Sequence, residues 1–465
     1  MILAIDQGTT GTTCLVVDAA LGVRGRAYAE LPQHFPAPGR VEHDPEEIWA
    51  GVLATAEAAL REAGARPQQL DAIGITNQRE TTLLWDRHTG RPVGNAIVWQ
   101  DRRTADRCRD LPAARLRELT GLISDPYFLA TKLEWLLAAT EPAGSLAFGT
   151  VDSWLVWKLS GGRMHVTDET NASRTLLVSL ATLDWDDELL GLFGVERELL
   201  PTIVPSSGVV CEVDLLGATV PVAGLAGDQQ AALHAAGGAK ATYGTGAFVL
   251  APTGGDCSPP PHGLLRTAAA RSAAQPPEYA LEGSVFVTGA AVQWLRDGLG
   301  LLADAGESSA VAESLSDNGG VYFVPALAGL GSPHWLPEAR GLVTGITGGT
   351  HRAHLVRAAL EATAYQTRDV LEAMPDTFHR LRADGGQTAN RFLMQFLADL
   401  LGIRVEVPAE REQTALGAAL LAGTAVGLWE EPPQPPPDAV YEPAAERGEA
   451  ERLYAGWREA LRRTL

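Results

Sequence analysis

The sequence predicts an α/β fold built from two related halves. Two turns of similar sequence, residues 6–11 (DQGTTG) and 243–247 (YGTGA), lie in different halves of the chain, and strand-like segments flank each of them. The first half alternates strand-like and helix-like segments, as α/β domains do. The chain has 465 residues, which is enough for two or three domains with separate cores. We therefore expect a pair of α/β domains, each built around one of the two turns.

The elements of the first half follow from their local patterns. Residues 1–5 and 12–17 are apolar and partly β-branched, and a glycine- and threonine-rich turn joins them, which predicts a hairpin. A helix is expected from Pro45 to about residue 63, because Asp44 can act as its N-cap and proline suits the first helical position. Further strands are expected at 71–75 and 95–99.

The second half is predicted to begin near the glycine pair 237–238 and to be mostly helical after its hairpin. Residues 252–277 are rich in proline, glycine and alanine, so we expect a surface loop there. The apolar stretch 415–429 is broken by glycines and is short for a membrane span, which predicts a buried, closely packed helix. Other helices are expected at 287–299, 353–374 and 390–401, and after a proline-rich spacer at 432–437.

The composition is that of a soluble globular protein and disfavours several functions. The net charge is −20 and the chain has only three lysines, so we expect no binding to nucleic acid or to anionic membranes. The first residues lack the basic and apolar regions of a signal peptide, and no membrane insertion is expected. The four cysteines are widely separated, which indicates neither a zinc site nor an export-type disulfide framework. A cytoplasmic location is therefore expected.

The two turns are suited to binding phosphate. Glycines expose backbone N–H groups, and threonine hydroxyls add further donors, so two such turns could hold a polyphosphate between them. Each turn alone is weak evidence, because most hairpins of this composition are only turns. No Gly-Lys pair occurs, so a Walker A loop is excluded. Asp6 and Asp228, which follow strand-like runs, are candidates for a hydrated magnesium ion, although a single Asp more often caps a turn.

Three polar clusters lie where α/β folds build ligand sites. Residues 76–80 (TNQRE) and 100–103 (QDRR) follow the strands expected at 71–75 and 95–99. Residues 381–386 (LRADGG) precede the helix expected at 390. Glycines before a helix let a base or ribose approach the backbone, although an ordinary turn and helix cap would have the same sequence.

Ordered motifs over most of the chain resemble the FGGY carbohydrate kinases. They include IDQGTTG, GITNQRETT, IVWQDRRT, DPYF, VTDETNASRT, AGDQQAAL, YGTGAF, ALEGSVF, ADGGQTAN and ALGAALLAG, between residue 2 and about residue 427. Within that family, QRETT, WQDRRT, DPYF and GDQQ are similar to the glycerol kinases. The resemblance implies two actin-like (ribonuclease H-like) ATPase domains with a cleft between them. We place these domains at 1–236, with the polyol site and first phosphate hairpin, and at 237–465, with the nucleotide site.

The implied reaction is ATP-dependent phosphorylation of glycerol to sn-glycerol 3-phosphate. The resemblance implies that Arg79 and Glu80 bind polyol hydroxyls, which fits chemically because hydroxyls need both a donor and an acceptor. A surface ion pair is the simpler alternative for these two residues. The resemblance adds Asp228 and Gln229 to the polar shell, together with Tyr127. Trp99 and Phe248 would form its apolar wall, whereas without the resemblance both would be assigned to the core.

The resemblance also implies the nucleotide side of the site. Asp6 would orient Mg²⁺ through water, and Asp228 would act as the general base. Contacts to the phosphates are expected from Thr9, Thr10, Gly11 and Thr245, contacts beside the nucleotide from Gly289 and Gln293, and contacts to the adenosine from Gly386 and Asn390.

Three alternatives stay open at this point. A kinase for another polyol or a ketose would keep the turns but change the polyol motifs. An actin-like or chaperone-like ATPase would have the turns without a polyol pocket, and a catalytically dead relative would lack Asp6 or Asp228. The expected partners are glycerol and ATP, and a homo-oligomer is expected.

Overall fold

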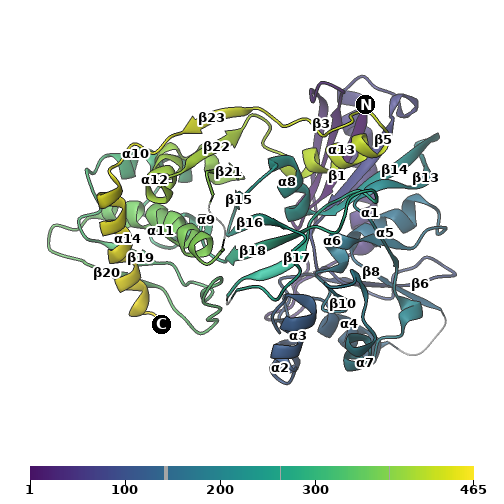
Figure 1. Ribbon diagram of the computed structural model, residues 1–465, viewed down its shortest axis with the longest axis horizontal. Helices are drawn as coiled ribbons and strands as arrows, with labels where there is room; N and C mark the ends of the chain where they lie inside the picture. Colours follow the sequence, from purple (N-terminus) through teal and green to yellow (C-terminus); the bar gives the residue numbers. More distant parts are fainter. Residues whose placement is uncertain (141–144, 262, 376–377) are drawn as a thin grey trace.

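The computed structural model describes residues 1–140, 145–261, 263–375 and 378–465, and it contains two large mixed sheets (Figure 1). The first sheet consists of residues from the first half of the chain. Its strands, in spatial order, are β13 (Ser207–Leu215), β14 (Ala218–Gly227), β5 (Ala72–Asn77), β1 (Ile2–Gln7), β2 (Gly11–Val17) and β3 (Val23–Glu30).

The second sheet consists of residues from the second half. Its strands, in spatial order, are β17 (Leu265–Ala268), β18 (Tyr279–Val285), β16 (Ala247–Gly254), β15 (Lys240–Tyr243), β21 (Arg380–Asp384), β22 (Arg404–Pro408) and β23 (Pro437–Tyr441).

The two sheets share one spatial order of strand orientations. In the first, the antiparallel hairpin β1–β2 is followed by β5 and β14, which extend the sheet in parallel, and by β13, which is antiparallel to β14. In the second, the hairpin β15–β16 is followed by the parallel strands β21 and β22 and the antiparallel strand β23. The predicted pair of related α/β halves is confirmed, and both predicted turns join hairpin strands.

Within the described ranges, shorter strands form five two-stranded sheets. The pairs are β4 (Glu42–His43) with β7 (Ala96–Ile97), β6 (Leu83–Asp86) with β8 (Leu146–Gly149), β9 (Val166–Asp168) with β12 (Thr202–Val204), β10 (Val178–Ser179) with β11 (Asp184–Trp185), and β19 (Tyr322–Val324) with β20 (Leu342–Thr344).

The helices cover the faces and ends of the two sheets (Figure 1). Those of the first half are α1 (Pro45–Glu62), α2 (Ala105–Arg109), α3 (Ala113–Thr120), α4 (Ala130–Ala139), α5 (Val151–Leu159), α6 (Glu169–Ala172), α7 (Asp187–Phe193) and α8 (Asp228–Ala236). Those of the second half are α9 (Gly289–Gln293), α10 (Ser308–Glu313), α11 (Arg352–Glu372), α12 (Arg391–Leu401), α13 (Gln413–Ala425) and α14 (Arg447–Arg462). In α1, the Asp44 side chain accepts a hydrogen bond from the Glu46 N–H, as expected of an N-cap.

The two faces of the first sheet are covered by helices from opposite ends of the sequence. Successive side chains of a strand point to opposite faces, so Leu3 and Ile5 pack with α1 whereas Ile2 and Ala4 pack with α13. Helix α13, yellow in Figure 1, accordingly lies beside the purple strands of the first sheet. The second half of the chain thus supplies a helix to the first sheet, which the sequence did not indicate.

Two predicted segments differ from the structure. The strand expected at 95–99 is reduced to β7, two residues that pair with β4 outside the main sheet. Ala96, Ile97 and Val98 are all buried although Val98 lies outside β7, so their hydrophobicity did not reveal how short the strand is. The loop expected at 252–277 contains β17, which pairs with β18 at the edge of the second sheet. Among the described residues, we find no helix with the length and apolar character that crossing a membrane requires.

Candidate active site

The polar residues 76–80 meet Asp6 and Asp228 where strands of the first sheet end. In register, Asp6 of β1 lies opposite Thr76 of β5, and Gly227 of β14 lies opposite Asn77. The chain therefore delivers Asp6, Arg79 and Asp228 at neighbouring strand ends, the edge at which α/β sheets bind ligands. The turn after β5 is unusual, because Glu80 has a φ of +61°. A non-glycine residue in the left-handed region is uncommon and occurs often at functional sites.

Arg79 is the centre of this cluster. Its side chain is buried, its Nε lies 3.2 Å from Oδ1 of Asp228, and its guanidinium lies 5.9 Å from the ring centroid of Phe248. It also donates to the Tyr127 hydroxyl at 3.4 Å. Burial alone would lower the pKa of Arg79, but Glu282 and the other nearby acids raise it well above its ordinary value. The structure therefore brings together four of the residues predicted to bind the polyol.

Glu80 does not form a surface ion pair. Its side chain is 1% exposed, and Oε1 accepts a hydrogen bond of 2.6 Å from Nε of Arg174. Burial raises the pKa of the Glu80 carboxyl by more than Arg174 and Arg79 lower it. The weak surface pair considered for Arg79 and Glu80 is therefore wrong, and both side chains belong to a buried ionic network.

Two charged residues of this network were not predicted. Arg174, in the turn after α6, donates to Glu282 of β18 at 3.0 Å, and Glu282 also accepts two hydrogen bonds from Arg79, at 2.6 and 3.1 Å. Both residues lie in motifs that carried the family resemblance, VTDETNASRT and ALEGSVF. One signal was available, because Glu282 interrupts an apolar strand, and a carboxylate buried there needs a cationic partner. Its partners come from the other half of the chain and could not be identified from the sequence.

Trp99 links the first turn to the cluster of Arg79, Glu80, Tyr127 and Asp228, which we call the polyol cluster after its predicted ligand. Its indole Nε1 donates to Oγ1 of Thr9 at 2.9 Å, and its ring meets that of Tyr127 edge to face at 5.5 Å. Trp99 is only partly buried. Core packing, the simpler alternative considered for this residue, therefore does not describe its position.

The helix that begins at Asp228 supplies two neighbouring side-chain amides, those of Gln229 and Gln230. Gln229 is buried and accepts a short hydrogen bond from the Lys240 ammonium, whereas Gln230 accepts from Arg79 at 3.2 Å and donates to Oγ1 of Thr267 at 2.8 Å. Lys240 and Thr267 belong to strands of the second sheet. Residues of both halves therefore fix the orientation of these amides.

The second turn packs against the start of α9. The carbonyl of Gly244 accepts a hydrogen bond from Gly289 N at 3.2 Å, and the carbonyl of Thr245 accepts one from Ala290 N at 3.0 Å. A Cβ at Gly289 would lie 2.5 Å from the Gly244 oxygen, so this approach requires glycine. Thr10 and Thr245 are exposed at the tips of their turns, Thr9 is partly buried, and Gly11 packs against Tyr28 at the start of β2.

The residues predicted around the adenosine follow β21, which ends beside β15 and therefore at the same end of the second sheet as this turn. Gln387, which follows Gly386, donates to the Gly244 carbonyl at 2.8 Å and so links the 385–386 glycine pair to the turn. Gly386 is exposed, and so is Gln293 at the end of α9. Asn390 caps α12, because its side chain accepts a hydrogen bond from Leu393 N and donates to Ser308. Its polar groups are therefore already occupied within the protein.

Asp6 lies in an electrostatically negative position. Burial raises the pKa of its carboxyl well above the ordinary value, and the nearby Asp228 and Glu412 raise it further. A cation would relieve this repulsion, and oxygen ligands suit Mg²⁺, which usually keeps several of its waters when bound. The residues therefore fit a hydrated Mg²⁺ ion, although the described residues include no group of three His, Cys, Asp or Glu side chains arranged to enclose a metal.

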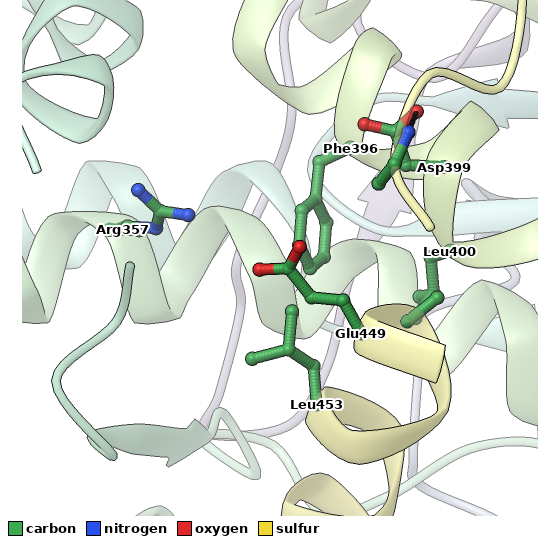
Figure 2. Close-up of a pocket in the computed structure, with 8 residues that line it drawn as sticks. Arg357, Phe396, Asp399, Leu400, Glu449 and Leu453 are labelled. Atoms are coloured by element: carbon green, nitrogen blue, oxygen red, sulfur yellow. Dashed lines mark hydrogen bonds between the residues drawn. The ribbon is translucent and has the colours of Figure 1, made fainter. Parts of the chain in front are cut away.

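Two cavities lie apart from the predicted site residues. One of about 100 Å³ lies between α11, α12 and α14, where Figure 2 shows Arg357, Phe396 and Glu449 among its lining residues. The other, of about 200 Å³, is lined by Gln230 and His234 of α8 and borders the polyol cluster through Gln230. None of the residues predicted to bind polyol or nucleotide lines either cavity.

A buried lysine behind Tyr127 gives the protein a testable pH dependence. Lys132 is fully buried, its Nζ donates to the Tyr127 carbonyl, and burial lowers its pKa from about 10.5 to about 7. Between these values the unfolded chain holds a proton that the folded chain has released, so stability rises with pH. From pH 7 to pH 9 we expect a gain of about 2 kcal/mol from this group, since one pKa unit corresponds to about 1.4 kcal/mol.

Urea unfolding of the wild type and of Lys132→Met at both pH values measures this gain. The variant should lack it, whereas Lys158→Met, at a lysine paired with Glu46 on the surface, should retain it. Equal pH dependences of the wild type and Lys132→Met would show that Lys132 does not titrate in this range.

Comparisons with known proteins place the chain in a family. The family model for the N-terminal domain of the FGGY family of carbohydrate kinases matches residues 1–235, and the model for its C-terminal domain matches residues 239–426. The chain belongs to the FGGY family of carbohydrate kinases. Within this FGGY family, the chain is 50% identical to glycerol kinase 2 of Thermotoga maritima, over all of this chain and 98% of the relative.

Solved structures of FGGY kinases share the whole fold. The crystal structure of Plasmodium falciparum glycerol kinase with ADP superposes with a TM-score of 0.93 at 34% identity, covering 100% of this chain and 98% of that one. A xylulose kinase from Brucella ovis reaches a TM-score of 0.88 at 25% identity, covering 99% and 97% of the two chains. The predicted two-domain α/β kinase fold is confirmed, whereas the residue assignments within the site stay predictions.

Proposed function

We propose that this FGGY kinase transfers the γ-phosphoryl group of ATP to a terminal hydroxyl of glycerol and produces sn-glycerol 3-phosphate and ADP. The arrangement of Arg79, Glu80, Tyr127 and Asp228 around one point carries the proposal, because it combines donors and acceptors for hydroxyl groups with an ionisable base. The similarity to proteins named glycerol kinase supports it.

Asp228 is suited to be the general base. Its Oδ1 accepts a hydrogen bond from Gln229 N at 2.7 Å and pairs with Nε of Arg79, which fixes the plane of the carboxylate. No hydrogen bond from the described residues reaches Oδ2, and the side chain is 29% exposed. Oδ2 would accept the proton of the attacking hydroxyl as its oxygen bonds to the γ-phosphorus and the bond from that phosphorus to the ADP oxygen breaks.

The other residues act by positioning and by stabilising charge. Arg79 and Glu80 would hold the remaining hydroxyls, with Gln229 beside them and Trp99 and Phe248 along the carbon chain. The two turns, with Thr9, Thr10, Gly11 and Thr245, would hold the phosphates through N–H and hydroxyl donors. Mg²⁺, held near Asp6 through water, would neutralise phosphate charge. Gly289, Gln293, Gly386 and Asn390 would border the nucleotide.

The proposal includes the organisation of the chain. We assign the polyol site to residues 1–236 and the nucleotide site to 237–465, and the presence of one large sheet in each range supports this division. A cytoplasmic location and a homo-oligomer stay predictions. Light scattering of the purified protein in solution measures its oligomeric state.

A coupled assay of ADP release tests the substrate assignment. Glycerol, erythritol, dihydroxyacetone, xylulose and gluconate are compared by kcat/KM at saturating MgATP, and glycerol should rank first. A ketose that clearly outranks glycerol would favour the alternative kinase, and ADP release independent of any polyol would favour an ATPase.

A substitution at Gly386 tests the proposed nucleotide site. A Cβ at Gly386 would meet no protein atom within 4 Å, so Gly386→Ala should leave folding intact and affect only a ligand at that position. We expect the KM for ATP to rise about tenfold, equivalent to about 1.4 kcal/mol, with the KM for glycerol unchanged. Gly348→Ala, at another glycine with open space around it, is the matched control. An unchanged KM for ATP would remove Gly386 from the nucleotide site.

A further inference from the structure

Glu282 has an unusual position for a residue of the second sheet. It is fully buried in β18, and its two carboxylate oxygens receive hydrogen bonds from Arg79 and Arg174, which both belong to the first half of the chain. Burial alone would raise its pKa, but the two arginines lower it to about 2. Glu282 is therefore an anion whose hydrogen bonds come from the arginines of the polyol cluster, and Lys240 contributes further to its low pKa.

The charges around the cluster determine which substrates it tolerates. Two guanidiniums, Arg79 and Arg174, face three carboxyl groups, those of Glu80, Glu282 and Asp228. The Arg174 Nε donates to Glu80 and its Nη2 to Glu282, and Arg79 donates to Glu282, so both guanidiniums are paired with carboxylates. Nη1 of Arg174 is buried without a hydrogen-bond partner among the described residues. A substrate carboxylate beside these two guanidiniums would find both already paired and would also meet the nearby anions, which is unfavourable for a buried charge. The neighbouring Lys240 ammonium donates to Gln229 and Thr242.

We propose that Glu282 is a specificity-determining residue, which gives the cluster one carboxyl group more than it has guanidiniums and so excludes anionic polyols. This inference rests on the proposed function, because it assumes that the Arg79 cluster binds the polyol. The selection works by exclusion. The site rejects an anionic analogue because both guanidiniums are already paired with carboxylates, and it needs no additional contact with glycerol. Without Glu282, two guanidiniums would face two carboxyl groups, so the excess negative charge of the cluster would be lost and a ligand carboxylate would be tolerated better.

Two charged analogues of glycerol serve as probes. Glycerate carries a carboxylate at one end, and 3-amino-1,2-propanediol carries an ammonium group. Their inhibition constants against glycerol phosphorylation are measured at saturating MgATP for the wild type, Glu282→Gln and Arg174→Gln. The quantity of interest is the ratio of the two constants within each variant, because it cancels a general loss of affinity.

The two variants should move this ratio in opposite directions. Glu282→Gln removes a negative charge and should shift the preference at least tenfold toward glycerate. Arg174→Gln removes a positive charge and should shift it at least tenfold toward the amine. A purely structural role for these residues would weaken both probes together and leave the ratio unchanged in both variants, which would overturn the proposal.

Controls separate folding from specificity. Glu361→Gln removes another buried carboxylate, which pairs with Arg357 away from the cluster, and it should leave the ratio unchanged. The double variant Glu282→Gln with Arg174→Gln restores the charge balance and should return the ratio to within about threefold of the wild type. If Glu282→Gln fails to fold, Arg174→Gln decides the question, since an unshifted ratio there overturns the proposal. A wild type that phosphorylates no glycerol would refute the proposed function instead, and the probes would then be titrated against its true substrate.

Discussion

Asp228→Asn should lower the kcat for glycerol phosphorylation by about two orders of magnitude or more, the usual effect of removing a positioned general base. The asparagine amide fills the same space, but it cannot accept the proton of the attacking hydroxyl. Arg79 keeps its two hydrogen bonds to Glu282, so the polyol cluster should stay assembled. Steady-state kinetics with saturating glycerol and MgATP measure the effect.

Nucleotide affinity and folding are the controls for this variant. The rise in melting temperature on adding ADP should match that of the wild type, because binding to the folded state alone stabilises it by mass action. Asp106→Asn removes an exposed carboxylate that pairs with Arg109 on the surface, and it should leave kcat unchanged. Near-normal turnover in Asp228→Asn would exclude Asp228 as the base.

The sequence predicted those parts of the fold that depend on short-range chemistry. The hairpins of β1–β2 and β15–β16 combine apolar, β-branched strands with glycine turns, and Asp44 with Pro45 marks the start of α1. These signals are local, so tertiary contacts did not change their outcome. The two-residue length of β7 could not be predicted, because it depends on the partner strand β4 that the segment finds in space.

The site was predicted where a residue lies at the end of a buried strand. Arg79 and Asp228 each follow a strand of the first sheet, and the pairing of β5 with β14 makes them neighbours. Arg174 and Glu282 complete the cluster, but nothing close to them in the sequence reveals their partners. An ionic network between residues about 100 or 200 positions apart emerges only when the two sheets come together.

The packing of α13 on the first sheet has the same long-range origin, and α13 also contacts α8, the helix that carries the proposed base. The predicted close packing of this glycine-containing helix is confirmed, because a Cβ at Gly74 of β5 would lie 2.2 Å from the Ala418 oxygen of α13. On α13 itself, a Cβ at Gly417 would lie 1.9 Å from the carbonyl oxygen of Ala231 in α8. Helix α8 begins with Asp228, so the packing of α8 against α13 should determine the position of the proposed base.

Gly417→Ala should therefore reduce both stability and turnover. Alanine is the better helix former, but its methyl group would overlap the α8 backbone, and overpacking of this kind typically costs about 1–3 kcal/mol. We expect the free energy of unfolding to fall by about 2 kcal/mol, within that range. Helix α8 must also move away, so kcat should fall by about tenfold or more, since small displacements of catalytic groups have effects of that order. Urea unfolding and steady-state kinetics measure the two effects.

Gly448→Ala is the matched control for this substitution. Gly448 lies in the first turn of α14, is exposed, and has no atom within 4 Å of the position its Cβ would take. It should gain up to about 1 kcal/mol of stability from helix propensity and leave kcat unchanged. If Gly417→Ala behaved in the same way, α8 would have room to accept a methyl group, and α13 would not determine the position of Asp228. A loss of stability with normal kcat would show that α8 and α13 separate without displacing the carboxylate.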